Sequence, residues 1–186
     1  MIIKQKYLIN EKTVLLYGVT YENGELFTFV IEGDDSFFVA MSPAALINTS
    51  LICYGSNLKG ALESSQLLLG KKRKKYPIKI DASMDIWLFP TKSYKKENCI
   101  WFALNQVKNT QPFGVKFTKV FLGYGHTIKI EMKESAFRDK RCQAEELKEM
   151  ITYNTKNSLN LSEKEKKGFV IVEENGRYKC KAMRNS

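Results

Sequence analysis

Runs of apolar residues predict strands over most of the first 130 residues. The runs are rich in β-branched and aromatic side chains, and Asn23-Gly24 lies between two of them as a hairpin turn. Strands are expected at 2–9, 13–20, 25–31, 37–41, 78–80, 86–89, 99–107, 115–122 and 127–132. Residues 78–80 and 86–89 look buried. A last hairpin, 169–172 with 178–182, would turn at Asn175-Gly176.

Helices are expected in fewer places. Ser42-Pro43 is an N-cap followed by proline, and it predicts a helix through about Tyr54 that ends at Gly55. Residues 134–153 have apolar residues on one side and charges elsewhere. Residues 56–70 read as a loop entering a short helix, and a capping box at 162–165 predicts a helix that stops at Gly168. The pattern predicts one α+β domain over 1–186, β-rich, with antiparallel hairpins and two or three helices.

The charge distribution along the chain indicates what kind of partner the protein binds. The net charge is +10, but residues 1–70 carry four basic and seven acidic side chains, whereas residues 71–186 carry twenty-six and thirteen. The first part therefore sums to −3 and the second to +13. This asymmetry favours a polyanion as partner, with nucleic acid first and an anionic membrane surface second. A basic surface with no ligand is the alternative.

Several classes of protein fit the composition poorly. No apolar run approaches the length of a membrane span, and charges interrupt the N-terminal residues where a signal peptide is apolar. The four cysteines are widely spaced and His126 is the single histidine, so neither a zinc site nor another cofactor site is expected. We expect a cytoplasmic protein with reduced, mostly buried thiols.

Enzymatic chemistry has few candidate residues. His126 follows Gly125 in a glycine-rich turn, where a general base would be poorly oriented. No phosphate-binding loop motif is present. Asp81 and Asp85 near Lys79 are the nearest match to a metal-dependent nuclease, although such residues more often cap a turn.

The strongest binding signal is the run of five cations at residues 71–75, which cannot all be buried and can neutralise several phosphates. Residues 43–70 only poorly imitate a helix-turn-helix, so a basic loop entering a narrow A/T-rich minor groove is the preferred geometry. An RNA- or single-strand-binding module is a further alternative. The candidate phosphate-contacting residues are Lys59, Lys71, Lys72, Arg73, Lys74 and Lys75, with Lys92, Lys95 and Lys96 as secondary candidates and Ser56 and Asn57 as groove contacts.

Residues 50–101 carry a set of motifs that resembles one family. Its parts are Ser50, the segment Tyr54-Gly55-Ser56-Asn57-Leu58-Lys59-Gly60, Pro77-Ile78, Asp81, Ile86-Trp87-Leu88-Phe89-Pro90-Thr91 and Cys99-Ile100-Trp101. In order and spacing this block resembles the centre of the ComK family of bacterial competence transcription factors. The family-like core covers about 42–110. Within it, we expect Phe89, Pro90 and Trp101 to serve the fold, and Gly55 and Gly60 to supply turns.

The resemblance implies a DNA-binding activator of competence, that is, DNA-uptake, genes. It implies binding of paired A/T-rich boxes largely from the minor groove, as a dimer that assembles further, and control by an adaptor that delivers the protein to a Clp protease. Where the family commonly has basic residues after the glycine matching Gly60, this chain has Ala61-Leu62. The basic run at 71–75 would compensate for their absence.

Overall fold

The computed structural model describes residues 2–21, 24–71, 75–159 and 169–182. The chain forms two compact units, Met1–Thr152 and Tyr153–Ser186, and the division falls within the long helix α3. Strands and hairpins outnumber helices, and nearly all strand pairs are antiparallel. The predicted β-rich α+β class is therefore confirmed.

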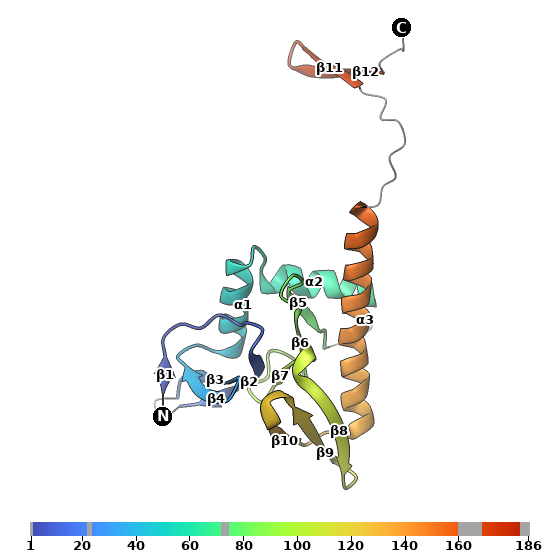
Figure 1. Ribbon diagram of the computed structural model, residues 1–186. Helices are drawn as coiled ribbons and strands as arrows, with labels where there is room; N and C mark the ends of the chain where they lie inside the picture. The colour runs from blue at the N-terminus through green and yellow to red at the C-terminus, as the bar shows by residue number, and fades with distance from the viewer. Residues whose placement is uncertain (1, 22–23, 72–74, 160–168, 183–186) are drawn as a thin grey trace. The chain divides into compact units, whose positions relative to one another are not determined.

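A seven-stranded sheet organises the first unit, in the order β1-β4-β3-β2-β7-β6-β5. Its strands are β1 (Ile3–Lys4), β2 (Thr13–Thr20), β3 (Leu26–Glu32), β4 (Asp35–Val39), β5 (Ile78–Asp81), β6 (Ile86–Pro90) and β7 (Ile100–Ala103). Two helices, α1 (Pro43–Cys53) and α2 (Leu58–Leu69), lie on one side of this sheet (Figure 1). A three-stranded sheet and α3 (Glu134–Leu159) complete the unit, and the strands of that sheet are β8 (Val107–Phe113), β9 (Phe117–Leu122) and β10 (Thr127–Ile130).

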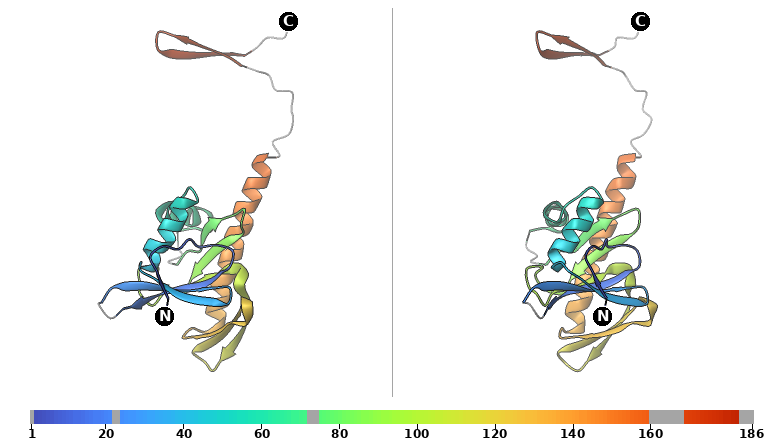
Figure 2. Two further views of the ribbon diagram at one scale, coloured as in Figure 1. Left: turned by 60° about the vertical axis from the view of Figure 1, so that its left-hand side comes forward. Right: turned by 90° about the vertical axis from the view of Figure 1, so that its left-hand side faces the viewer.

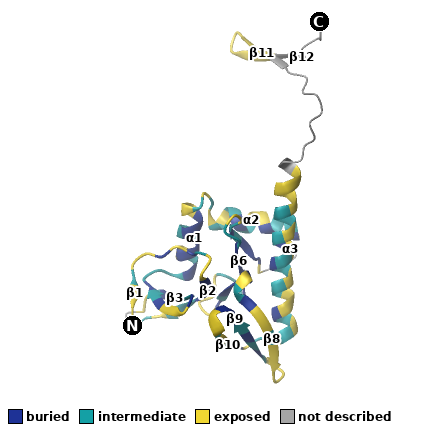
Figure 3. Ribbon diagram, viewed as in Figure 1, coloured by how far each residue is buried: buried dark blue, intermediate teal, exposed yellow. Residues whose placement is uncertain are grey.

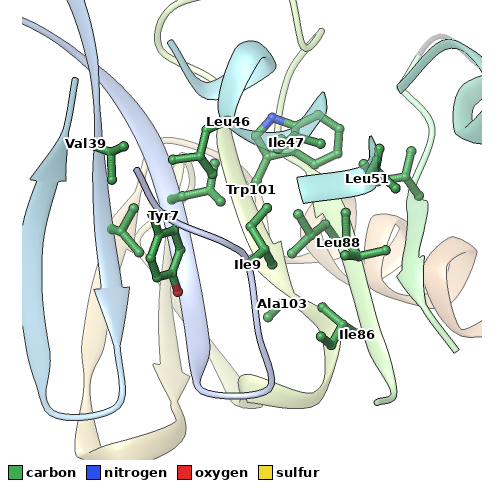
Figure 4. Close-up of a cluster of buried hydrophobic side chains, with 14 of the residues drawn as sticks. Tyr7, Ile9, Val39, Leu46, Ile47, Leu51, Ile86, Leu88, Trp101 and Ala103 are labelled. Atoms are coloured by element: carbon green, nitrogen blue, oxygen red, sulfur yellow. The ribbon is translucent and has the colours of Figure 1, made fainter. Parts of the chain in front are cut away.

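Both faces of the central strands are buried, which explains their continuous apolar sequence. Along β6, Ile86 and Leu88 face the cluster under the helices, whereas Trp87 and Phe89 face a second cluster with α3. Figure 4 shows the first cluster, in which Trp101 lies among side chains from α1, β6 and β7. In the second cluster the rings of Phe89, Phe102 and Phe137 pack with centroids 5.2–5.7 Å apart.

Local signals in the sequence set several boundaries correctly. Ser42 accepts a hydrogen bond from the Ala45 N–H at 3.3 Å and caps α1, with Pro43 as the first helical residue. Gly55 follows α1 with a φ of +79°, a conformation that glycine adopts without strain. Phe89, Pro90 and Trp101 are buried, as expected of residues that serve the fold.

Other expectations were wrong for physical reasons. The run 2–9 forms a strand only at Ile3–Lys4, because Tyr7 and Ile9 are buried as a loop over the core. The run 99–107 is broken by a 3-10 turn at Leu104–Gln106, because β7 and β8 belong to different sheets. β8 itself was not predicted.

The α2 region also differs from its prediction. Residues 58–69 form a full helix rather than a short one after a loop, and Gly60 lies inside it rather than in a turn. Ala61 is buried and Leu62 packs on the core, which places the residues that replace the family's basic pair in the interior.

The second unit contains the end of α3 and the hairpin of β11 (Phe169–Glu174) and β12 (Arg177–Ala182). This hairpin turns at Asn175-Gly176, as predicted. The predicted helix at 162–168 lies outside the described residues. Figure 2 gives two further views of the chain.

Two other features bear on function. No helix in the described ranges is long and apolar enough to cross a membrane. The expectation of mostly buried thiols was wrong: Cys53 and Cys142 are exposed and Cys99 is buried, all three as free thiols.

Candidate nucleic-acid interface

The start of α2 holds three of the predicted site residues. Asn57 caps the helix, and its side-chain oxygen accepts a hydrogen bond from the Gly60 N–H at 2.8 Å. Ser56 is half-buried, and its N–H donates to the Leu51 carbonyl at 2.8 Å. Lys59 is exposed, with its ammonium 3.9 Å from Glu63. Asn57 therefore already has a structural role, and Lys59 has a weak partner on its own helix.

The basic run begins at the other end of α2. Gly70 ends the helix with a φ of +86°, and Lys71 and Lys75 are both exposed. Lys72, Arg73 and Lys74 lie outside the described residues. Because a helix rises about 1.5 Å per residue, the twelve-residue α2 separates Lys59 from Lys71 by roughly 18 Å. The structure does not bring these two predicted contacts together.

The secondary candidates Lys92, Lys95 and Lys96 lie on the loop between β6 and β7. Consecutive turns order this loop: the Lys96 N–H donates to Ser93 at 2.9 Å, and the Cys99 N–H donates to Lys96 at 3.0 Å. The Cys99 thiol contacts the Lys92 carbonyl at 3.3 Å, and burial raises the pKa of this thiol. Lys95 and Lys96 are exposed on an ordered backbone, and Lys92 is half-buried.

Two clefts connect this loop with the end of the basic run. One, of about 240 Å³, is lined by Leu62, Gln66, Lys75, Tyr76, Pro90, Tyr94 and Trp101. The other, of about 250 Å³, is lined by Leu26, Ser42, Pro43, Ala44, Tyr94, Lys95, Lys96, Glu97, Cys99 and Trp101. Because Tyr94 and Trp101 line both clefts, the cleft that Lys75 lines adjoins the cleft that Lys95 and Lys96 line.

Lys140 of α3 joins the same region and was missed by the sequence reasoning. Burial lowers the pKa of its half-buried ammonium, and the nearby positive charge of Lys75 lowers it further. Its sequence neighbours are also charged, so only the tertiary fold distinguishes it from a solvated residue of α3. We name the basic loop cluster for its five members: Lys75, Lys92, Lys95, Lys96 and Lys140. None of them forms an ion pair with another described residue.

The acidic candidates for metal chemistry have structural partners instead. Asp81 accepts hydrogen bonds from the Ser83 hydroxyl at 2.6 Å and the Met84 N–H at 2.8 Å, which lower its pKa and confirm its role in a turn. Asp85 accepts from Trp87 at 2.8 Å and pairs with Lys148 of α3 at 2.7 Å. Across the ranges that the structure describes, no three His, Cys, Asp or Glu residues are grouped to hold a metal.

His126 also has a structural contact. It lies in the loop before β10, as predicted, and its Nε2 is 2.7 Å from the Gly33 carbonyl. This contact joins the loop to the turn between β3 and β4.

The two helices α1 and α2 follow one another through a connection at residues 54–57, and the Leu58 N–H donates to the Asn48 side chain at 2.9 Å. The described exposed face of α2 carries one cation and one anion, Lys59 and Glu63, which pair with each other. A recognition helix in the major groove usually presents several donors to the bases. This helix pair does not have that character.

The comparisons with known proteins agree with the resemblance found in the sequence. The family model described as "ComK protein" matches residues 4–156. The chain belongs to the ComK family. A curated relative from Bacillus subtilis (strain 168), named "Competence transcription factor", is 26% identical over 136 residues, which cover 73% of this chain and 70% of the relative. No solved structure gives a significant match.

The ComK match places the described site in context. Residues 4–156 include α2, the loop between β6 and β7, and Lys140, so every member of the basic loop cluster lies within the ComK region. The hairpin of β11 and β12 lies beyond it. The matched relative is named as a transcription factor, a class distinct from enzymes.

Proposed function

We propose that this protein is a competence transcription factor that activates DNA-uptake genes by binding double-stranded, A/T-rich DNA. Membership of the ComK family and the name of the curated relative support the transcriptional role. The observation that carries DNA binding is the basic loop cluster, in which Lys75, Lys95 and Lys96 are exposed and Lys140 is half-buried within the influence of the Lys75 charge.

In the free protein, repulsion between the ammonium groups of the cluster is unfavourable. A bound polyanion would turn this unfavourable term into a favourable one, because each ammonium group would then face a negative charge. Each lysine that reaches a phosphate releases condensed counterions, so affinity should fall steeply with salt. Lys71 and the basic residues at positions 72–74 would add further phosphate contacts, and Lys59 would add a separate contact from the far end of α2.

Minor-groove binding fits the side chains better than major-groove reading. Four of the five cluster lysines are on loops and Lys140 is on α3, whereas α2 presents a nearly neutral face. Narrow A/T-rich minor grooves concentrate negative potential and attract basic side chains. The paired boxes come from the ComK resemblance, and two boxes match two copies of the chain.

The proposal extends to regulation and assembly on the same family grounds. We propose a homodimer or larger assembly on DNA, located in the cytoplasm, and delivered to a Clp protease by an adaptor. These features rest on the family assignment.

Fluorescence anisotropy tests DNA binding directly. Duplexes with two A/T boxes and G/C-rich controls are titrated across a salt series, with and without a minor-groove-binding drug. We compare Lys95→Gln/Lys96→Gln with a matched control, Lys6→Gln/Lys12→Gln, whose lysines are also exposed but lie outside the basic loop cluster. The first pair should reduce the salt slope by about one for each phosphate that is no longer neutralised, and the control should not.

Other outcomes would select the alternatives. Equal binding to both duplexes with identical slopes for the two variants would contradict the proposal. Preference for single-stranded RNA would favour the RNA-binding module. Divalent-metal-dependent strand cleavage that Asp81→Asn abolishes would favour the nucleic-acid enzyme.

A further inference from the structure

A second basic surface lies on the three-stranded sheet, and it contains none of the phosphate-contacting residues predicted from the sequence. We name residues 107–122 the arm: β8, the turn at 114–116, and β9. Residues 107–130 carry four lysines and no Asp or Glu, namely Lys108, Lys116, Lys119 and Lys129. The end of the arm is a projecting, exposed hairpin (Figure 3).

The two faces of this sheet differ in character. Thr118, Val120 and Leu122 are buried, and the latter two join the cluster that packs against α3. The opposite face alternates aromatic rings with ammonium groups. The ammonium of Lys129 lies 4.1 Å from the ring centroid of Phe113 and 4.6 Å from that of Phe117. That of Lys119 lies 5.1 Å from the Phe121 ring.

The tip of the arm is apolar as well as exposed. Pro112, Phe113 and Val115 follow closely in sequence; Phe113 is 52% exposed and Val115 is 80% exposed. Gly114 makes the turn between them with a φ of +66°. Exposed apolar residues are ordinary when scattered, but here they are grouped at the end of a projecting hairpin surrounded by cations.

The chemistry of the tip fits one known way of binding nucleic acid. Proteins that bend DNA insert apolar wedges such as Phe or Pro between base pairs from the minor groove, while basic side chains hold the adjacent phosphates. The exposed end of the hairpin, residues 113–116, lies beyond the buried Thr118, and the depth of the minor groove is about 7.5 Å. At about 3.3 Å per residue, three exposed residues on one side of the turn span roughly 10 Å, which is enough for the tip to reach the base pairs.

We propose that the tip of the arm inserts Val115 and Phe113 into a base-pair step of the bound DNA from the minor groove and bends it. Lys116, Lys119 and Lys129 hold the phosphates on either side. This inference rests on the proposed function, because it concerns the same A/T-rich duplex. Flexible pyrimidine–purine steps such as TA would be the preferred insertion site, since they are the easiest to unstack.

The test separates insertion from binding. A duplex with two A/T boxes carries 2-aminopurine beside a TA step, and the fluorescence of this base rises when it is unstacked. The same duplex carries a donor–acceptor pair at its ends, whose energy transfer reports bending. We compare the wild type with Val115→Ser, with Phe113→Ser/Val115→Ser, and with the control Ile52→Ser, whose side chain is 59% exposed on α1. Because Val115 lies exposed in a turn, its substitution should leave the circular dichroism spectrum unchanged.

We expect the wild type and Ile52→Ser to brighten 2-aminopurine and bring the duplex ends together. Val115→Ser should lose most of both signals. The double variant should lose them entirely and bind roughly ten-fold more weakly, with an unchanged salt slope because every lysine is retained.

Each failure has a distinct meaning. If the wild type does not bind the duplex, the proposed function fails. If it binds without either signal, or if the tip variants retain both, only the insertion is overturned. Vesicles of anionic phospholipid are titrated in parallel, and loss of vesicle binding by tip variants that still bend DNA would identify a membrane-inserting tip and overturn the proposal.

Discussion

The basic loop cluster and the arm are both cationic, but they are built differently. In the cluster, the lysines come from two loops and a helix, and Lys75, Lys95 and Lys96 line clefts that share Tyr94 and the buried Trp101. In the arm and the adjoining β10, regular strands present Lys119 and Lys129 beside aromatic rings, and exposed apolar residues are at the tip. Contacts between lysines and phosphates give affinity but do little to determine the conformation of the DNA. An inserted apolar tip, by contrast, acts by deforming the DNA. The comparison suggests that the two surfaces contribute different parts of one binding event.

The largest expected effect is the loss of stability on replacing Trp101, the buried side chain that lines both clefts of the cluster. Trp101 is 1% exposed and lines both clefts, so Trp101→Ala should lower the free energy of unfolding by about 3–5 kcal/mol. Urea denaturation measures this. Phe113→Ala on the arm is the matched aromatic control and should cost below about 1 kcal/mol, because half of its surface is already exposed. Equal losses would show that the arm is as integral to the core as the cluster is.

The second prediction is that removing charge from the cluster weakens DNA binding without lowering the stability of the protein. Lys75→Gln/Lys140→Gln removes two ammonium groups that repel each other, so the free energy of unfolding should stay the same or rise. DNA affinity should fall by at least roughly ten-fold near 0.1 M salt, because two phosphates are no longer neutralised. Parallel denaturation and anisotropy measurements check both signs. A loss of stability together with unchanged affinity would remove the cluster from the interface.

The third prediction concerns the attachment of α3, which carries Lys140. Burial by itself raises the pKa of Asp85, but hydrogen bonds from Lys148, Asn105 and Trp87 outweigh burial and hold it below its ordinary value of 3.8. Asp85→Asn should cost about 0.5–1 kcal/mol at neutral pH, since the ion pair is half-exposed. Asparagine tolerates the positive φ of 54° at this position, so the backbone should not add to the cost.

The pH dependence of this variant follows from the direction of the shift. A carboxyl whose pKa is lower in the folded than in the unfolded state stabilises the protein at any pH above its unfolded-state pKa. This contribution is lost as the pH falls through the folded-state pKa. The difference between the wild type and Asp85→Asn should therefore be constant above about pH 5 and should shrink below about pH 4. Thermal unfolding at a series of pH values measures it, and a difference that grows on acidification would contradict the assignment.

The smallest expected effect is at Lys59. Because α2 separates it from Lys71 by roughly 18 Å and Glu63 lies nearby, Lys59→Ala should weaken DNA binding by no more than about two-fold. Anisotropy at low salt, where phosphate contacts are strongest, is the sensitive measurement. A reduction as large as that of the Lys75/Lys140 variant would extend the interface along the whole of α2.

The sequence predicted the elements whose signals are local. The continuous apolar run at 86–89 marks a strand buried on both faces, and Ser42-Pro43 marks the start of α1. β8 was missed because its sequence is polar and contains Pro112; the strand exists through its pairing with β9. α2 was underestimated because its glycine and serines have low helix propensity, and tertiary packing of Ala61 and Leu69 outweighs that preference.

The candidate site was predicted in part for the same reason. A run of lysines indicates exposure and charge, so Lys71, Lys75, Lys95 and Lys96 could be identified from composition alone. The packing of α3 brings Lys140 under the influence of the Lys75 charge, and the length of α2 keeps Lys59 away from Lys71. No spacing in the sequence indicates how these helices pack. The tip of the arm was missed because its apolar residues are indistinguishable in sequence from those of a buried strand.

Energy transfer across one labelled duplex with two A/T boxes tests the division between the two surfaces most directly. In each titration the midpoint reports affinity and the plateau reports the bend, and repeating it at several salt concentrations gives the salt slope. We expect Lys95→Gln/Lys96→Gln to lower the salt slope and keep the wild-type plateau, whereas Val115→Ser should lower the plateau and keep the slope. If both variants change slope and plateau in the same proportion, the two surfaces act as one and the account is contradicted.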